Sequence, residues 1–196
     1  MLESVYLTKS KVRSKLLGVL FSNPDKKYYL SELARLIHAS IGNVQRELER
    51  FVKDGLIRFE KKGNLSFYFL NPGHALYPEI RSLVLKTVGI EGEIRGLVMK
   101  DREIGLAVLY GSFARETEHG ESDIDLLVVS DGKLEKFYAA ISKLESKFGR
   151  EINPTVYARL EFVKKIASRD SFIEHVLKRP HRLLKGSLDE YRKKAA

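Results

Sequence analysis

Apolar residues in the first half of the chain recur at helical spacing and then change to the alternating spacing of strands. A repeat of three or four residues places apolar side chains on one face of a helix, and strict alternation places them on one face of a strand. Ser31 and Ser40 are the expected N-caps of the second and third helices. The predicted elements of this half are helices at 10–21, 31–37, 40–54 and 77–88 and strands at 57–62 and 65–70.

The second half opens after a boundary at 89–92, where two glycines interrupt the pattern. Residues 104–110 are a nearly unbroken apolar run, which is typical of a buried central strand. We therefore predict two domains, 1–88 and 89–196, and expect 192–194 to be a frayed, solvated end. The predicted elements are strands at 104–110, 124–129 and 151–157 and helices at 90–99, 134–148, 160–167 and 172–177.

Composition sets the broad class of the protein. The chain has 196 residues, 43% of them hydrophobic, which is enough for two small domains with real cores. It has no cysteine, which excludes disulfides, thiolate metal sites and a cysteine nucleophile and fits a reducing cytoplasm. No apolar run reaches membrane-spanning length, so we expect a cytoplasmic protein with no membrane partner.

The positive charge is concentrated in the first half. Residues 1–88 hold 15 Lys and Arg against 8 Asp and Glu, or +7, whereas the whole chain carries +9. A localised positive field favours a polyanionic partner such as nucleic acid. A basic surface without any partner is the alternative interpretation.

The succession of three helices and a hairpin is the order of a winged helix-turn-helix. Over 31–70 the chain resembles winged-helix transcription regulators, in the short second helix, in the spacing of Val44 and Leu48, and in the Asp54-Gly55-Leu56-Ile57 entry to the hairpin. The resemblance implies that the third helix enters the major groove of double-stranded DNA. A module used only for dimerisation or protein contact is the alternative.

Side chains on the outer face of the third helix suit base edges and phosphates. Asn and Gln match adenine, and Arg matches guanine or phosphate. Such regulators are commonly dimers, so we expect a homodimer, with the 77–88 helix as the candidate dimer element. The candidate DNA-binding residues are Ser40, Asn43, Gln45, Arg46 and Arg50, with Lys61 and Lys62 at the hairpin tip.

The most specific motif joins Gly111 and Ser112 to an Asp-x-Asp pair at the head of a strand. Asp123 and Asp125 are two positions apart, so in a strand they point the same way, and they repel each other unless a cation lies between them. Mg²⁺ takes such oxygen ligands and keeps positions open for phosphate. The pattern predicts a metal–nucleotide site; solvated acids in a loop are the plain alternative.

This order of strand, Gly-Ser turn, Asp-x-Asp strand, helix and strand resembles the polymerase-β-like nucleotidyltransferase superfamily, over about 90–177. The resemblance implies that Asp123 and Asp125 hold Mg²⁺ and that ATP or another NTP is the substrate of nucleoside monophosphate transfer. It also implies nucleotide-binding roles for Gly111, Ser112, Arg115 and Ser122. The expected fold class is thus α/β (α+β): a winged helix-turn-helix followed by a nucleotidyltransferase fold with a small mixed sheet flanked by helices.

Members of that superfamily use a third carboxylate from a later strand. Glu151 is our candidate for this catalytic and metal-binding acid, with Asn153 on the same face of a regular strand. The chain departs from the family pattern here, because the third acid is usually Asp. It also has Glu116 where many members have Gly. These departures affect the expectation of catalysis more than that of nucleotide binding.

Three functions are compatible with the sequence. The first is a DNA-binding transcriptional regulator whose second domain binds Mg-ATP and can transfer a nucleoside monophosphate. The second is an antitoxin-type adenylyltransferase that modifies a helical nuclease as its protein acceptor. The third is a DNA-binding protein whose nucleotidyltransferase domain is inactive.

Overall fold

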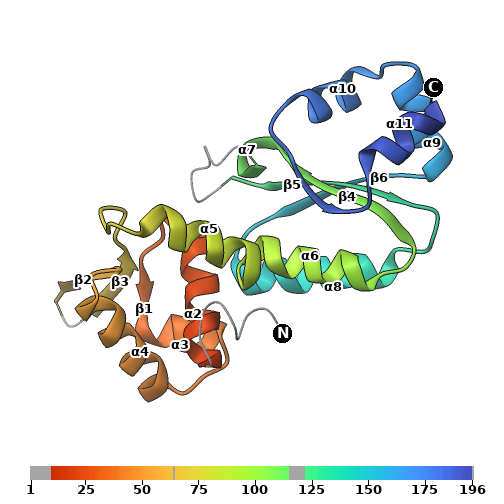
Figure 1. The fold of residues 1–196 in the computed structure, drawn as a ribbon. Helices are drawn as coiled ribbons and strands as arrows, with labels where there is room; N and C mark the ends of the chain where they lie inside the picture. Colours follow the sequence, from red (N-terminus) through yellow and green to blue (C-terminus); the bar gives the residue numbers. More distant parts are fainter. Residues whose placement is uncertain (1–9, 64, 115–121, 196) are drawn as a thin grey trace. The chain divides into compact units, whose positions relative to one another are not determined.

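The structure is a computed structural model that describes residues 10–63, 65–114 and 122–195. The chain divides into two compact units, Met1–Glu93 and Ile94–Ala196. No helix among the described residues is both long and apolar enough to cross a membrane. The first unit contains α2 (Lys11–Ser22), β1 (Tyr28–Tyr29), α3 (Leu30–Leu36), α4 (Ile41–Lys53), β2 (Ile57–Lys62), β3 (Leu65–Leu70) and α5 (Tyr77–Thr87) (Figure 1).

Helix α4 shows how the first unit is built from its pattern of apolar residues. Val44, Leu48 and Phe51 are buried at spacings of four and three, so they form one face of the helix against the core. The core also receives Phe21 of α2 and Tyr28 of β1. Burial of these large side chains is the main favourable term in holding the helices and the sheet together.

The small sheet of the first unit has the strand order β1–β3–β2, with both pairs antiparallel. Within the hairpin, Arg58 pairs with Phe69 and Lys62 pairs with Leu65. Gly55 follows α4 with φ of +78°, a conformation that glycine adopts without steric cost, and so the chain turns from helix into β2.

Of the two predicted N-caps, the structure confirms that of α4 and not that of α3. Ser40 is the N-cap residue of α4, although its side chain makes no capping hydrogen bond. Ser31 is not an N-cap, because α3 already begins at Leu30 and its N-cap is the extended Tyr29. The short strand β1 therefore runs directly into the helix without a polar cap.

The second unit is a four-stranded sheet with helices on both faces. Helix α6 (Ile90–Lys100) begins in the first unit and ends in the second. Strand order is β6–β5–β4–β7; β5 and β6 are parallel and the other pairs antiparallel. The remaining elements are β4 (Ile104–Tyr110), α7 (Gly111–Ala114), β5 (Ile124–Ser130), α8 (Glu135–Phe148), β6 (Ile152–Tyr157), α9 (Arg159–Ala167), α10 (Ser171–Lys178), β7 (Arg182–Lys185) and α11 (Leu188–Ala195).

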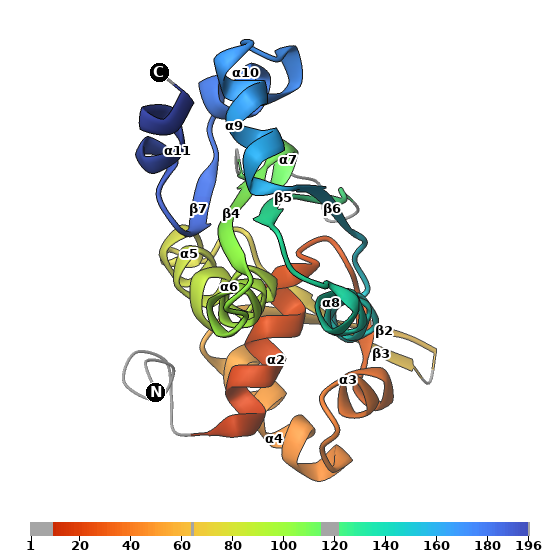
Figure 2. The same cartoon turned by 90° about the vertical axis from the view of Figure 1, so that its right-hand side faces the viewer.

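Helices α9, α10 and α11 cover one face of this sheet, and α8 lies on the other (Figures 1 and 2). On the first face, strand residues such as Val108 and Leu127 pack against Phe162 of α9, Ile173 of α10 and Tyr191 of α11. The predicted α+β class, with a small mixed sheet flanked by helices, is confirmed. Strand β7 and helix α11 were not predicted: residues 192–194 are exposed as expected, but they are helical.

Candidate active site

The Gly-Ser turn begins at the end of β4, where Gly111 starts the short helix α7. Gly111 has φ of +75°, which side-chain-bearing residues rarely adopt. A Cβ atom at this position would also overlap Oδ2 of Asp125. The absence of a side chain therefore lets the turn lie directly against the carboxylate, and this juxtaposition joins the two halves of the motif in space.

Asp125 is the inner member of the Asp-x-Asp pair. It lies on β5 opposite Tyr110 of β4 and Asn153 of β6. Asp123 lies just before the strand and is exposed. Burial raises the pKa of the Asp125 carboxyl, and the charge of Asp123 raises that pKa further. A cation between the two carboxylates would relieve both effects, so the pair fits the Mg²⁺ that the sequence predicts.

Asn153 completes the cluster from the neighbouring strand. Its Nδ2 donates a hydrogen bond to Oδ2 of Asp123 over 3.3 Å. Glu151 lies just before β6, where its backbone carbonyl accepts from the Ile124 amide over 3.0 Å. No three His, Cys, Asp or Glu side chains gather into a metal-binding group within the described ranges. The role of Glu151 as third acid stays a prediction.

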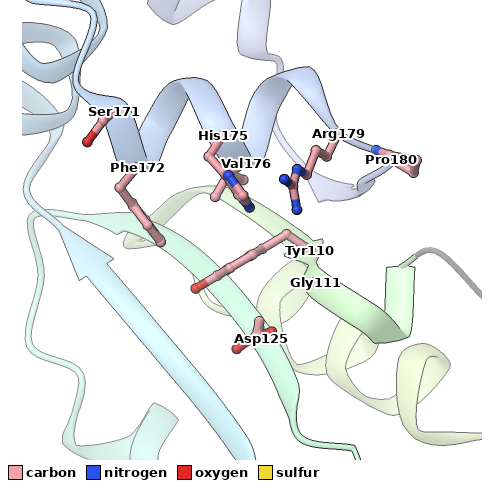
Figure 3. A pocket seen from close by; sticks show the side chains of 9 residues that line it. All are labelled: Tyr110, Gly111, Asp125, Ser171, Phe172, His175, Val176, Arg179 and Pro180. Atoms are coloured by element: carbon pink, nitrogen blue, oxygen red, sulfur yellow. The ribbon is translucent and has the colours of Figure 1, made fainter. Parts of the chain in front are cut away.

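A cavity of about 510 Å³ opens beside Asp125. This volume is within the range of small-molecule sites. Its floor comes from the end of β4 and from β5, and its opposite wall is α10, as Figure 3 shows. The lining residues are Tyr110, Gly111, Asp125, Ser171, Phe172, His175, Val176, Arg179 and Pro180.

Two aromatic rings form one end of this cavity. Tyr110 and Phe172 meet edge to face, with ring centroids 5.7 Å apart. The Tyr110 hydroxyl is 3.3 Å from Oγ1 of Thr155, which holds the ring in place over the sheet. Burial raises the pKa of the Tyr110 hydroxyl, so this group remains protonated near neutral pH.

The α10 wall was missed by the sequence prediction, which placed a helix here but no site residue. A signal was present in the four-residue spacing of Ser171, His175 and Arg179, which aligns polar side chains along one side of a helix. Spacing within one helix does not show what the helix packs over, however. Only the fold brings this row to face Asp125.

Ser112 and Ser122 are two further predicted nucleotide-binding residues. Ser112 is in α7 and half-buried. The Ser122 carbonyl accepts a hydrogen bond from buried Arg150, whose guanidinium lies 5.3 Å from the Phe113 ring centroid. Arg150 thus links the turn after β4 to the residues that lead into β5. Arg115 lies outside the described residues.

The predicted DNA-binding side chains lie on the solvent face of α4 and on the hairpin. Arg50 donates to buried Glu47 over 3.1 Å, and Glu47 also binds Arg13 over 2.8 Å. Gln45 donates to Glu49 on the next turn, and Lys62 forms an ion pair with Glu60. All seven predicted residues are exposed: Ser40, Asn43, Gln45, Arg46, Arg50, Lys61 and Lys62.

A comparison with protein families matches residues 92–186 to the model described as Polymerase beta, Nucleotidyltransferase. A little less than half of the chain is therefore a nucleotidyltransferase domain, and it contains every residue of the predicted nucleotide site. No curated protein is significantly similar to the chain.

Solved structures show weaker likeness. A toxin–antitoxin with AMP-PNP is 20% identical over 54% of this chain and 80% of that chain, with a TM-score of 0.38. A tri-AMPylated HEPN toxin of Shewanella oneidensis in complex with MNT antitoxin is 16% identical over 54% of this chain and 77% of that chain, with a TM-score of 0.33. The archaeal chromatin protein TrmBL2 is 13% identical over 91% of this chain and 76% of that chain, with a TM-score of 0.29. With TM-scores below 0.5, none of these likenesses assigns a function to the chain.

Proposed function

We propose that the second unit transfers a nucleoside monophosphate from a magnesium-bound nucleoside triphosphate, ATP in the first instance, to a hydroxyl of a partner protein. The observation that carries the proposal is a cavity of nucleotide size lined by Asp125, whose partner Asp123 is hydrogen-bonded to Asn153. The match of 92–186 to a nucleotidyltransferase family supports the same reaction class.

The bonds exchanged in this reaction are few. The acceptor oxygen forms a bond to the α-phosphorus, the bond from that phosphorus to the bridging oxygen breaks, and pyrophosphate leaves. The acceptor proton passes to a carboxylate, for which Glu151 is our candidate. When bound, Mg²⁺ supplies positive charge that neutralises the phosphates, and Asp123 and Asp125 are the residues that would hold it.

A protein acceptor suits the exposure of the site. Asp123 is exposed, whereas Asp125 is partly covered and lines the cavity, so the nucleotide can lie inside while a hydroxyl approaches from outside. The acceptor class that we propose is a helical nuclease toxin, as the resemblance to minimal antitoxin nucleotidyltransferases implies. The protein would then silence its partner by adenylylation.

The first unit has a second proposed function, binding of double-stranded DNA as a winged helix-turn-helix. A specific observation favours it: the polar face of α4 is exposed while its apolar face forms the core. The +7 charge of residues 1–88 is the electrostatic complement of phosphate. In an operon with a toxin, this unit would serve autoregulation.

The test of transfer uses the full chain, ATP labelled at the α-phosphate, Mg²⁺ and a purified candidate toxin. We expect label on the toxin with the unchanged protein and none with the Asp123→Asn/Asp125→Asn double variant. Lys143→Asn, a substitution on the exposed surface of α8, is the control and should retain activity. Equal labelling by the double variant would contradict the proposed site.

A further inference from the structure

Helix α10 and Arg179, the C-cap residue that follows it, place polar residues along one wall of the cavity. Ser171, His175 and Arg179 are spaced four residues apart, and all three line the cavity wall that faces Asp125. In Figure 3, His175 and Arg179 point down from the helix toward Tyr110. The wall is therefore polar along one line and carries a cation at one end.

That cation is available to a ligand. Among the described residues no carboxylate forms an ion pair with Arg179, whereas its neighbour Lys178 pairs with Glu174 over 2.8 Å. Lys178 does not line the cavity and Arg179 does. Two adjacent basic residues thus differ in their surroundings, because one is neutralised outside the cavity and the other faces into it.

The two ends of the cavity differ in chemistry. At one end Arg179 lies above Gly111, the first residue of the turn predicted to hold phosphates; at the other, Phe172 approaches the ring of Tyr110 (Figure 3). A guanidinium binds phosphate oxygens through paired N–H groups, while aromatic rings bind the faces of nucleobases. A ligand with a polyanionic end and an aromatic end matches this division.

We propose that α10 and its C-cap residue set the direction in which the nucleotide lies, with the β- and γ-phosphates at Arg179 and the base at Phe172. The inference rests on the proposed nucleotidyltransferase function and adds the residues that distinguish a triphosphate from a monophosphate. Arg179 neutralises phosphate charge from the side of the cavity opposite Asp125. Phe172 contributes stacking that is common to all nucleotides with the same base.

The experiment measures binding of ATP and of AMP to the full chain in Mg²⁺ by calorimetry. Arg179→Met keeps an unbranched apolar stem and removes the charge, and Lys178→Met is the matched control at the preceding position, the last residue of α10. We expect Arg179→Met to weaken ATP binding by roughly tenfold or more, because a charge-assisted hydrogen bond is lost. AMP affinity should change little, and Lys178→Met should bind both ligands as the unchanged protein does.

A second variant tests the other end. Phe172→Leu should weaken ATP and AMP by the same factor, since it removes a ring that faces the base. Thermal unfolding of each variant confirms that the fold is retained. Equal losses of ATP and AMP in Arg179→Met, or no loss, would overturn the inference while leaving the proposed function intact. Failure of the unchanged protein to bind any nucleotide would contradict the proposed function and this inference with it.

Discussion

The backbone of Gly111 lies so close to the carboxylate of Asp125 that no side chain fits between them. The first residue of the Gly-Ser turn and the second aspartate of the Asp-x-Asp pair therefore form one unit, although 14 positions separate them in the sequence. Any ligand held by the turn must lie beside the carboxylate. This contact is the geometric basis of the candidate site.

Gly111→Ala should destabilise the second unit and disturb the site together. The positive φ alone costs about 1–2 kcal/mol for a residue with a Cβ, and the overlap with Asp125 adds to this. Gly149→Ala is the matched control, because Gly149 also has a positive φ, +65°, but open space around it. We expect Gly111→Ala to lower the unfolding temperature more than Gly149→Ala and to weaken Mg-ATP binding, which Gly149→Ala should leave unchanged. Equal effects of the two variants would contradict the close contact.

Asp125→Asn should stabilise the protein at neutral pH when no divalent cation is present. Because the folded state raises the pKa of Asp125, it holds that proton more tightly than the unfolded state does. This contribution to stability is present at low pH and is lost as pH rises through the raised pKa. Asn removes the cost of the buried charge, so the gain in unfolding temperature should be largest near pH 7.

The pH series provides the check on Asp125→Asn. The gain should shrink as the pH falls below about 4, where aspartate is protonated in the unfolded chain as well. Saturating Mg²⁺ and ATP should stabilise the unchanged protein more than the variant, since ligand binding favours the folded state only where the site is intact. A gain that is independent of pH would show that the charge of Asp125 is not its cause.

Substitutions at Glu151 and Asn153 test which of the two positions serves for a third carboxylate. If Glu151 is the acid that receives the acceptor proton, Glu151→Gln should keep Mg-ATP binding and lose most of the transfer to the toxin. Robust transfer by Glu151→Gln would show that another group has this role.

Asn153→Asp tests the alternative position. Asn153 is bonded to Asp123 and pairs with Asp125, so a carboxylate there would join the two existing ones. We expect Asn153→Asp to bind Mg²⁺ more tightly, as calorimetry would show, and to unfold at a lower temperature without the ion, because three like charges repel. Unchanged Mg²⁺ affinity would place residue 153 outside the ion's reach.

If the first unit binds DNA as proposed, Arg46→Ala should weaken binding of the full chain to duplex DNA. Arg46 is exposed on α4, so its removal leaves the core of the first unit intact. Loss of a base contact costs about 1–3 kcal/mol, and loss of a phosphate contact lowers the salt dependence. Fluorescence anisotropy with duplex DNA at two salt concentrations separates these cases, with Lys143→Ala as a charge-matched control. No binding at low salt by the unchanged protein would contradict the DNA-binding proposal.

The strongly periodic elements could be predicted from the sequence, and those fixed by tertiary contacts could not. Strands 57–62, 65–70 and 104–110 were predicted with the ends that the structure has. Strand β7 is short and half charged, and it forms because β4 offers a free edge to residues 182–185. Helix α11 has few apolar residues, and Tyr191 is the one that it buries, so the sequence shows no apolar repeat there. For this reason the helix was not predicted.

The same distinction holds within the site. Asp123 and Asp125 form a local Asp-x-Asp pattern at the head of an apolar strand, which the sequence alone reveals. The hydrogen bond of Asn153 to Asp123 depends on the parallel register of β6 with β5, and no local pattern states that register. His175 and Arg179 become site residues only because α9 and α10 fold back over the sheet.

The docking of β7 and α11 has a consequence for the order of events during synthesis. β7 pairs with β4, and Tyr191 of α11 packs edge to face on Phe162 with ring centroids 5.3 Å apart. Both elements follow the site residues in the chain, so they leave the ribosome after every residue of the cavity. Domains fold as units and the N-terminal one folds first. The first unit can thus complete its fold early, whereas the second unit reaches its final form only after β7 and α11 have emerged.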